Sequence, residues 1–334
     1  MCEKEKIVEV CRKYSSFLIG SHINPDGDSL GSELAFASLL KRMGKKVKVL
    51  NPTLPPSIYD FLPYREWIST KEKGEGWEVG IVLDCSEYER LREVKTFFSS
   101  LPIVINIDHH ISNRRFGDIN FLDTKASSVG EMVYQLFLAF AQQPTKEEAL
   151  LLYVAILTDT NCFRFSTTSY THQIISNLLA TGLKPQEIQE KIYSIPFSGI
   201  KLIERVLSTL QISEDGKIVW GEINQRMIDE IREAEKIEEI THTDVLINYL
   251  CAIKDVEVVA LFKELNSSEE REQEKRVKVS LRSKGKVDVN RIAKLFEGGG
   301  HFRASGCSIS GELKEIESKV IEEIRKEVER SLRR

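Results

Sequence analysis

Residues 16–31 read SFLIGSHINPDGDSLG, and this stretch joins an apolar run, a tight loop and the start of an apolar-periodic segment. The apolar run at 16–21 predicts a buried strand. A proline and a glycine in the loop favour a sharp turn, and the periodicity from Leu30 to Met43 predicts a helix. A strand that leads through a short loop into a helix is typical of a parallel sheet.

The same alternation continues through the first half of the chain. Further apolar runs predict strands at 47–50, 80–83 and 102–107. Helical patterns follow at 128–142 and 146–157, with Pro144 between them as a breaker. Short apolar strands spaced by helices predict an α/β fold with a parallel sheet that is covered on both faces.

The second half repeats the alternation after a helical segment at 185–210, which is less hydrophobic and suits a connector. A helix is expected near 241–253, a hairpin tip at 266–272 and an amphipathic helix at 311–334. Strands are expected at 217–222, 256–263 and 276–282. We therefore predict three parts, with the active site in the cleft between the first and the last: a catalytic domain at 1–190, a helical connector at 191–213 and a smaller α/β substrate-binding domain at 214–334.

The composition is that of an ordinary soluble globular protein, with 41% hydrophobic and 29% charged residues among 334. No run approaches the ~20 apolar residues that span a bilayer, and the start lacks the apolar core of a secretory signal, so we expect a cytoplasmic protein without membrane contact. Six scattered cysteines form no C-x-x-C pair, and the net charge of −4 argues against a wide footprint on duplex DNA. The oligomeric state stays open, a homodimer included.

The loop after the first strand is the first candidate site. His22, Asp26 and Asp28 place one imidazole and two carboxylates within seven residues. Two carboxylates this close repel each other unless cations neutralise them, which favours a metal site. The alternative is an Asn-Pro-Asp-Gly turn with a helix cap and an incidental histidine.

Other acidic and imidazole side chains also follow apolar segments. Asp108, His109 and His110 end one strand, Asp84 follows another, and Asp159 follows a helix. Adjacent histidines point in different directions, so one can bind a metal while the other faces a substrate. Asp108 can orient a histidine through a hydrogen bond. Asp84 or Asp159 alone would more often be a cap or turn residue.

Position and charge connect these candidates. In an open parallel sheet the loops at the carboxyl ends of the strands gather along one edge, where ligands bind. Four aspartates balance the charge of two divalent cations. Two cations roughly 3.5–4 Å apart can clamp the attacking and leaving oxygens of a phosphoryl group. The pattern therefore predicts metal-dependent hydrolysis of phosphate esters.

A glycine-rich segment in the second half is a candidate anion site. Residues 298–306 read GGGHFRASG. Glycines let backbone N–H groups approach an anion closely, and His301 and Arg303 supply donors beside them. A helix terminator is the alternative, but one glycine would satisfy it. Arg282, at a predicted strand end, suits a bidentate phosphate contact.

Together these segments resemble the DHH phosphoesterase family, which is named for the motif found here at 108–110. The histidine–aspartate loop, Asp84, the DHH triplet and Asp159 occur in the family's order, over nearly the whole chain. The Gly-Gly-Gly-His segment matches the glycine-rich motif of the DHH-associated C-terminal domain. Ser305, where that motif more often has alanine, and Cys85 are small departures.

The resemblance implies a role for each candidate. One metal would be held by His22, Asp26 and Asp84, and the second by Asp28, Asp84, His109 and Asp159. A bridging hydroxide would attack phosphorus, with His110 at the scissile phosphate and Asp108 beside it. The nucleotide would be bound by Arg282, Gly299, Gly300, His301 and Arg303. The family usually prefers manganese, and mixed oxygen and imidazole ligands would also accept magnesium or cobalt.

Within the family the chain is most similar to NrnA-type nanoRNases, which also dephosphorylate 3′-phosphoadenosine 5′-phosphate (pAp). The expected substrates are short oligoribonucleotides, cleaved to 5′-mononucleotides, and pAp, converted to AMP. Alternatives within the family are a phosphodiesterase of cyclic or linear dinucleotides and a single-strand exonuclease. A catalytically inactive nucleotide-binding protein is the alternative from another class, but every expected metal ligand is present.

Overall fold

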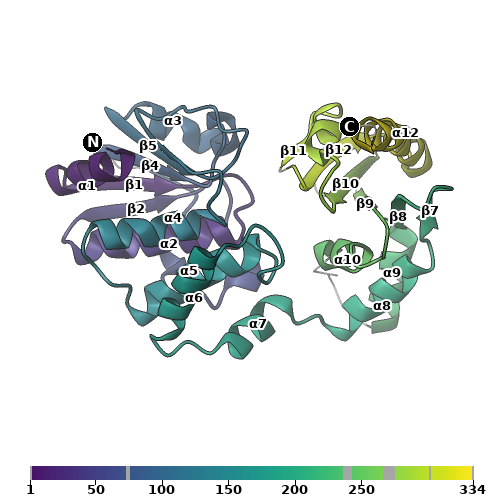
Figure 1. Ribbon diagram of the computed structural model, residues 1–334, viewed down its shortest axis with the longest axis horizontal. Helices are drawn as coiled ribbons and strands as arrows, with labels where there is room; N and C mark the ends of the chain where they lie inside the picture. Colours follow the sequence, from purple (N-terminus) through teal and green to yellow (C-terminus); the bar gives the residue numbers. More distant parts are fainter. Residues whose placement is uncertain (1, 73–75, 236–242, 266–274, 301, 333–334) are drawn as a thin grey trace. The chain divides into compact units, whose positions relative to one another are not determined.

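The computed structural model describes residues 2–72, 76–235, 243–265, 275–300 and 302–332. The chain forms two compact units, Met1–Ser194 and Ile195–Arg334, called unit 1 and unit 2 below (Figure 1). The predicted hairpin tip at 266–272 lies outside the described residues. The three predicted parts, 1–190, 191–213 and 214–334, are defined by their roles as well as by their bounds. That division stays a prediction.

Unit 1 is built on a parallel sheet, as its sequence predicted. The strands are, in sheet order, β3 (Ile68–Ser69), β2 (Lys46–Leu50), β1 (Ser16–Gly20), β4 (Val79–Leu83), β5 (Ile103–Asp108) and β6 (Ile119–Leu122). All neighbouring strands are parallel. The strand order reverses between β1 and β4, and a crevice for ligands forms at such a point, outside the carboxyl ends of the strands.

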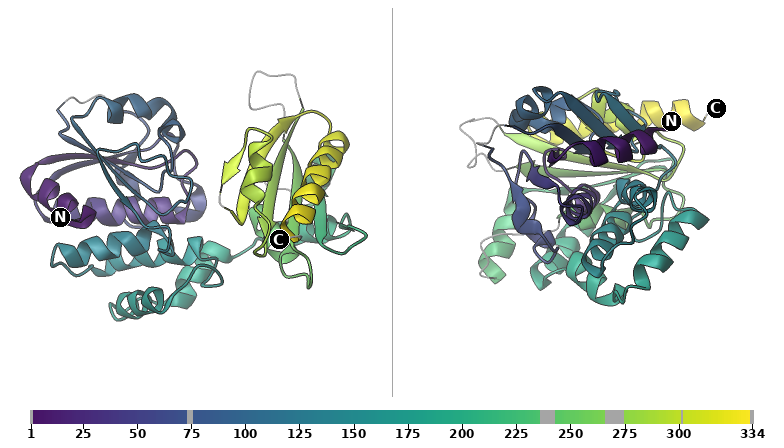
Figure 2. Two further views of the ribbon diagram at one scale, coloured as in Figure 1. Left: turned by 45° about the horizontal axis from the view of Figure 1, so that its top comes forward. Right: turned by 90° about the vertical axis from the view of Figure 1, so that its left-hand side faces the viewer.

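Side chains of the sheet alternate between two hydrophobic cores. In β1, Phe17 and Ile19 pack into the larger core, whereas Leu18 packs into the smaller one on the opposite face. The larger core is covered by α1 (Glu3–Lys13), α2 (Gly27–Arg42), α4 (Val129–Ala139), α5 (Lys146–Asp159), α6 (Ser169–Leu179) and α7 (Pro185–Tyr193). The smaller core is covered by the 3-10 segment η3 (Tyr88–Val94) and α3 (Lys95–Ser99). The sheet is therefore covered on both faces (Figures 1 and 2).

Two glycines allow α2, α4 and α5 to pack closely. A Cβ atom at Gly31 on α2 would lie 2.3 Å from the carbonyl oxygen of Leu151, and one at Gly130 on α4 would lie 2.5 Å from Cβ of Ala155. Contacts this short are sterically forbidden, so both positions require glycine. The close packing brings the beginnings of α2 and α4 to the end of α5.

Unit 2 contains a mixed sheet. Its strands are, in sheet order, β11 (Gly299–Gly300), β12 (Ala304–Ser310), β10 (Arg276–Ser283), β9 (Val258–Leu265), β8 (Ile218–Ile223) and β7 (Gln211–Ile212). Strands β8 and β9 are parallel, and the other neighbours are antiparallel. Helices α11 (Val289–Lys294) and α12 (Leu313–Leu332) pack on one face. Helices α8 (Phe197–Leu207), α9 (Gln225–Glu235) and α10 (Thr243–Leu250) pack on the other.

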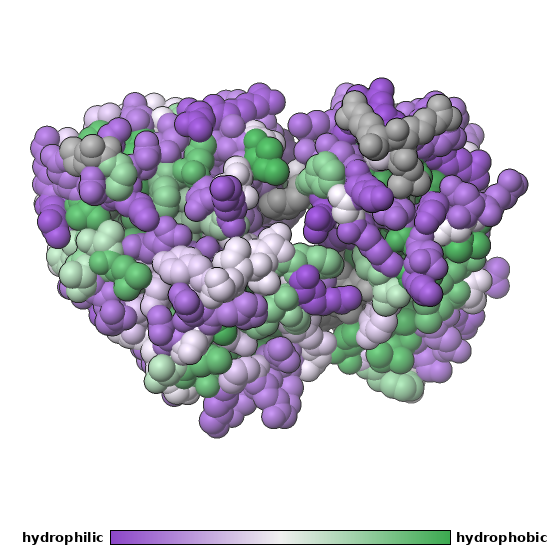
Figure 3. Space-filling view, viewed as in Figure 1, coloured by the Kyte–Doolittle hydropathy of each residue, from purple (hydrophilic) through white to green (hydrophobic). Residues whose placement is uncertain are grey.

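The amphipathic helix predicted at the end of the chain is α12. The apolar residues predicted for its inner face are all buried: Ile316, Val320, Ile321, Ile324 and Val328. Helix α8 differs, because it is apolar on two sides. It packs Leu202 and Val206 into unit 2, while Phe197 and Ile200 are 65% and 46% exposed. Figure 3 shows hydrophobic residues gathered at the surface over this helix.

Candidate active site

The predicted site residues of unit 1 meet at the carboxyl edge of its sheet. His22 follows β1, Asp84 follows β4 and Asp108 ends β5. These strands lie on both sides of the point where the strand order reverses. Asp159 is the last residue of α5, which glycine packing holds against α2 and α4. The fold thus brings together residues that are far apart in the sequence.

Asp84 lies at the centre of this group. It is 2% exposed, and its backbone adopts the left-handed conformation with a φ of 53°. Its Oδ2 accepts a hydrogen bond from Oγ of Ser29 at 2.7 Å and lies 3.4 Å from Nε2 of His22. Its Oδ1 is buried without a hydrogen-bond partner among the described residues. A buried carboxylate oxygen in this state costs free energy unless a ligand satisfies it.

His22 and Asp26 approach Asp84 from the loop after β1. One ligand atom from each of these three residues lies within 4.8 Å of the other two. The Oδ1 of Asp26 also caps α2, because it accepts hydrogen bonds from the N–H groups of Asp28 and Ser29 at 3.1 and 3.0 Å. One imidazole and two carboxylates at this spacing can hold a divalent cation.

Asp28, His109 and Asp159 form a second group with the same spacing. Nε2 of His109 lies 4.0 Å from Oδ2 of Asp28 and 3.4 Å from Oδ2 of Asp159. Asp28 is also fixed by α4, since it accepts hydrogen bonds from the N–H groups of Val129 and Gly130 at 2.7 and 2.9 Å. The second group can therefore hold another cation, next to the first.

The clustered carboxylates change one another's acidity. Burial, with the charges of Asp84 and Asp159, raises the pKa of Asp28 well above its usual value. Burial raises the pKa of Asp159 to about 6. Burial acts in the same direction on Asp84, but its hydrogen bond with His22 and the charges of the histidines outweigh it and lower the pKa of Asp84. Bound cations would relieve this repulsion between carboxylates.

Asp108 and His110 form a pair beside the two groups. Asp108 is fully buried, and its Oδ1 lies 2.6 Å from Nδ1 of His110 in a hydrogen bond. The ring planes of His109 and His110 are inclined by 78°. The two rings are therefore nearly perpendicular to each other. Asp84, His109 and His110 make a third group whose ligand atoms lie within 4.8 Å.

Sequence reasoning missed two polar residues that support the site. Oγ of Ser29 lies 2.8 Å from Nε2 of His22 and also donates to Asp84. Nδ2 of Asn113 donates to Oδ2 of Asp108 at 2.5 Å. Ser29 directly follows Asp28, and Asn113 comes three positions after His110. This closeness to predicted site residues is the one sequence signal that could have indicated their roles.

Cys85 directly follows Asp84, but its side chain packs into the smaller core and belongs to none of the ligand groups described above. Its Sγ donates to the carbonyl oxygen of Glu87 at 3.1 Å. Burial raises the pKa of this thiol to about 12. A buried neutral thiol fills space and is a poor metal ligand.

The substrate-binding candidates of unit 2 lie around β10, β11 and β12. Arg282 is near the end of β10, opposite the start of β12. Gly299 and Gly300 form β11 and are exposed. Gly300 has a φ of 144°, a conformation that requires glycine. Arg303 is exposed, and His301 lies outside the described residues.

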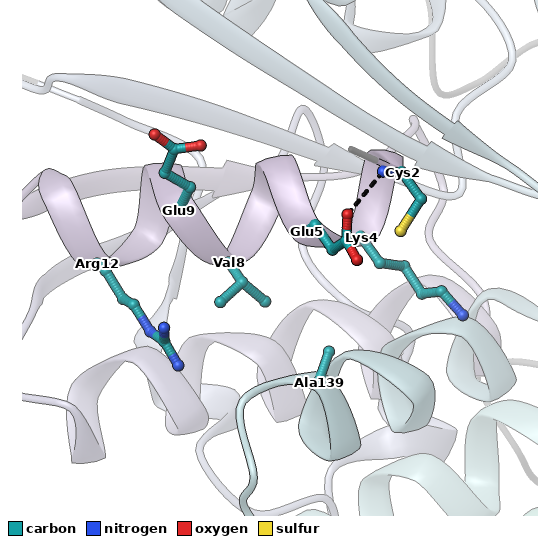
Figure 4. Close-up of a pocket in the computed structure, with 7 residues that line it drawn as sticks. All are labelled: Cys2, Lys4, Glu5, Val8, Glu9, Arg12 and Ala139. Atoms are coloured by element: carbon teal, nitrogen blue, oxygen red, sulfur yellow. Dashed lines mark hydrogen bonds between the residues drawn. The ribbon is translucent and has the colours of Figure 1, made fainter.

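A surface hollow in unit 1 is separate from these candidates (Figure 4). It runs along α1 and is lined by Cys2, Lys4, Glu5, Val8, Glu9, Arg12 and Ala139. None of the predicted site residues lines it.

Comparisons with known proteins identify the family of the chain. Residues 16–156 match the N-terminal domain of the DHH family, and residues 231–334 match the DHHA1 domain. The bifunctional oligoribonuclease and PAP phosphatase NrnA of Thermus thermophilus is 32% identical over 94% of this chain and 90% of its own length. The Bacillus subtilis protein of the same name is 26% identical over 92% and 93%. The crystal structure of an exopolyphosphatase-related protein from Bacteroides fragilis is 27% identical, with a TM-score of 0.85 over 96% of this chain and 94% of that one.

The chain therefore belongs to the DHH family of metal-dependent phosphoesterases, as its sequence predicted. Among the residues that the structure describes, no helix combines the length and the hydrophobicity needed to cross a membrane.

Proposed function

We propose that this phosphoesterase cleaves short oligoribonucleotides to 5′-mononucleotides and converts pAp to AMP. The observation that carries the proposal is the pair of metal-ligand groups that lie side by side at the carboxyl edge of the unit 1 sheet. Relatives named for an oligoribonuclease and a PAP phosphatase align with nearly the whole chain, which supports this pair of substrates.

In this proposal Asp84 would be a ligand in two cation sites. His22 and Asp26 would complete one site, and Asp28, His109 and Asp159 would complete the other. The buried Oδ1 of Asp84, which accepts no hydrogen bond from the described residues, fits this role, because a cation would satisfy it. We propose manganese, which mixed oxygen and imidazole ligands accept. When bound, the cations would supply an acidified water and neutralise charge on the phosphoryl group.

His110 would act on the substrate and not on the metal. Its Nδ1 is engaged by Asp108, so Asp108 fixes the ring and directs Nε2 away from itself. We assign the proton of that hydrogen bond to Nδ1. Nε2 would then contact the scissile phosphate and assist departure of the leaving oxygen.

The candidates of unit 2 would add affinity for the nucleotide. The guanidinium groups of Arg282 and Arg303 suit bidentate contacts with phosphate. Backbone N–H groups of Gly299 and Gly300, with His301 next to them in the sequence, would approach the same anion.

The test is hydrolysis by chelator-stripped protein to which manganese has been restored. The panel would contain RNAs of two to about 24 nucleotides, pAp, cyclic dinucleotides and pyrophosphate, with Asp84→Ala as the inactive variant. Asp229→Ala is the matched control, because Asp229 is an exposed carboxylate on α9. We expect rapid turnover of the shortest RNAs and pAp, lost only in Asp84→Ala. A preference for long strands or cyclic dinucleotides would replace the proposed substrates.

A further inference from the structure

A buried glutamate of α4 is linked to the second metal-ligand group without belonging to it. Glu131 is 4% exposed and is the third residue of α4. Its Oε2 accepts hydrogen bonds from Oγ of Ser127 at 2.6 Å and from Oγ1 of Thr171 at 2.8 Å. Both of these hydroxyl residues are fully buried. A carboxylate at this depth is costly unless donors satisfy it, so the three side chains form a fixed polar cluster.

The hydrogen bonds of Glu131 differ from those of an ordinary helix cap. In a capping box, a glutamate at the third position of a helix accepts a hydrogen bond from the N–H group of the N-cap residue. Glu148 does so at the same position of α5, where its Oε2 accepts from the N–H group of Thr145 at 2.8 Å. Glu131 accepts instead from Ser127, which precedes the N-cap, and from Thr171 on α6. Its bonds therefore join two segments of unit 1.

The first of these segments, residues 126–130, positions two of the three ligands through its main chain. Its first carbonyl oxygen lies 3.3 Å from Nδ1 of His109. A carbonyl oxygen can only accept, so this contact assigns the proton to Nδ1 and leaves Nε2 as the nitrogen for a cation. The N–H groups of its last two residues donate to Asp28 at 2.7 and 2.9 Å. Glu131 holds the middle of this segment through Ser127.

The second segment continues from the third ligand. Asp159 is the last residue of α5, and residues 160–168 join it to α6. Thr171 is the third residue of α6, and its hydroxyl group donates to Glu131. Glu131 thus ties the segment that orients the first two ligands to the helix that follows the third.

We propose that Glu131 is a positioning residue that keeps the second metal-ligand group in its cation-binding geometry. The inference rests on the proposed function, in which Asp28, His109 and Asp159 hold the second cation. Among the described residues, the hydrogen bonds of Glu131 lead toward this group and not to the loop that carries His22. Loss of the carboxylate should therefore weaken one cation site and spare the other.

The experiment measures manganese binding to the full chain by equilibrium dialysis. Glu131→Ala is compared with the unmodified protein, and Ser127→Ala is a milder variant that tests the same cluster. Glu148→Ala is the matched control, because Glu148 is a fully buried glutamate at the same position of another helix. It lies about 16 Å along α5 from Asp159. Thermal unfolding in chelator would verify that each variant is folded.

We expect Glu131→Ala to weaken one of two manganese sites by about 10- to 100-fold, with little change at the other. Ser127→Ala should weaken the same site by a smaller factor. Glu131→Gln keeps an acceptor oxygen and should therefore lose less affinity than Glu131→Ala. Glu148→Ala should bind both cations like the unmodified protein, even where its unfolding midpoint falls.

Two ligand variants identify the site that is weakened. His22→Ala removes a ligand of the first group only, and His109→Ala removes one of the second. Added to His22→Ala, Glu131→Ala should leave no tight site, whereas added to His109→Ala it should cause no further loss. Unchanged binding in Glu131→Ala, equal weakening of both sites, or fewer than two manganese ions per unmodified chain would overturn the proposal.

The binding data are independent of the proposed substrates. If the unmodified protein binds two manganese ions but hydrolyses neither short RNAs nor pAp, the proposed substrates fail, and manganese binding still decides the role of Glu131. If the substrates are hydrolysed while Glu131→Ala keeps both sites at full affinity, only the positioning role fails.

Discussion

The candidate site residues of the two units differ in how deeply they are buried. In unit 1, Asp28, Asp84 and Asp108 are at most 2% exposed and sit in networks of hydrogen bonds. In unit 2, Gly299 and Arg303 are exposed. Buried charges cost much free energy unless they are neutralised, whereas exposed donors cost little. This difference supports our proposal that the chemical step takes place in unit 1 and that unit 2 adds part of the substrate affinity.

The largest effect should follow from changing Asp84 in the buried centre of unit 1. Asp84→Asn removes the charge that would serve both cations in our proposal, so we expect loss of both cations and a fall in kcat of about 10³-fold or more. Elemental analysis of the dialysed protein and hydrolysis of pAp would measure the two losses. If Asp84→Asn keeps both cations, Asp84 is not the ligand that serves both sites, and the proposal is contradicted.

A smaller effect is expected for the buried carboxylate that is not a proposed ligand. Asp108→Asn keeps the shape of the side chain but weakens the hydrogen bond that orients His110. We expect kcat to fall by about 10²-fold while metal content stays constant. A parallel loss of metal would show that Asp108 belongs to the metal centre. Asp108 would then no longer differ in role from the aspartates that we propose as metal ligands.

Chelation should destabilise unit 1 and leave unit 2 unaffected. A cation that binds only the folded state stabilises it by about 2.7 kcal/mol at a concentration 100 times its Kd. Calorimetric unfolding of the full chain, with manganese and with chelator, should show a lower midpoint only for the transition of unit 1. Asp84→Asn provides the control, because chelator should no longer shift its unfolding. Equal shifts in both units would contradict the proposed location of the metals.

The smallest effect is expected in unit 2. Arg282→Gln should raise KM for pAp about tenfold, with kcat nearly unchanged, because it removes the guanidinium that we propose binds phosphate and that also donates to the carbonyl oxygen of Leu281. Arg291→Gln is a suitable control, because Arg291 is an exposed arginine on α11, where its Nε lies 3.9 Å from Oε2 of Glu327. A large fall in kcat for Arg282→Gln would place part of the chemistry in unit 2.

The sequence predicted the parallel sheet and the clustering of its aspartates and histidines because both follow from local patterns. Apolar runs marked β1, β4 and β5, and the polar residues that follow these runs necessarily share one sheet edge. The start of α2 was predicted less well. It begins at Gly27 instead of near Leu30, because Asp26 caps the helix before its apolar periodicity starts.

Other features depend on tertiary contacts that no local pattern encodes. Helix α1 lies in a segment of mixed charge, and only its contacts in the folded unit bury Ile7, Val8 and Cys11. Ser29 and Asn113 are common polar residues, and their roles become visible only when the loops meet. Position in the fold, more than residue type, therefore determines which polar side chains support the site.

The candidate metal ligands all precede residue 160, and unit 1 ends at Ser194. Domains generally fold as units, the N-terminal one first, while the chain is being synthesised. We therefore expect unit 1 to complete its sheet and acquire its cations while much of unit 2 is still on the ribosome. In the lifetime of each molecule, the capacity to cleave a phosphate ester would then arise before the residues that help select the nucleotide.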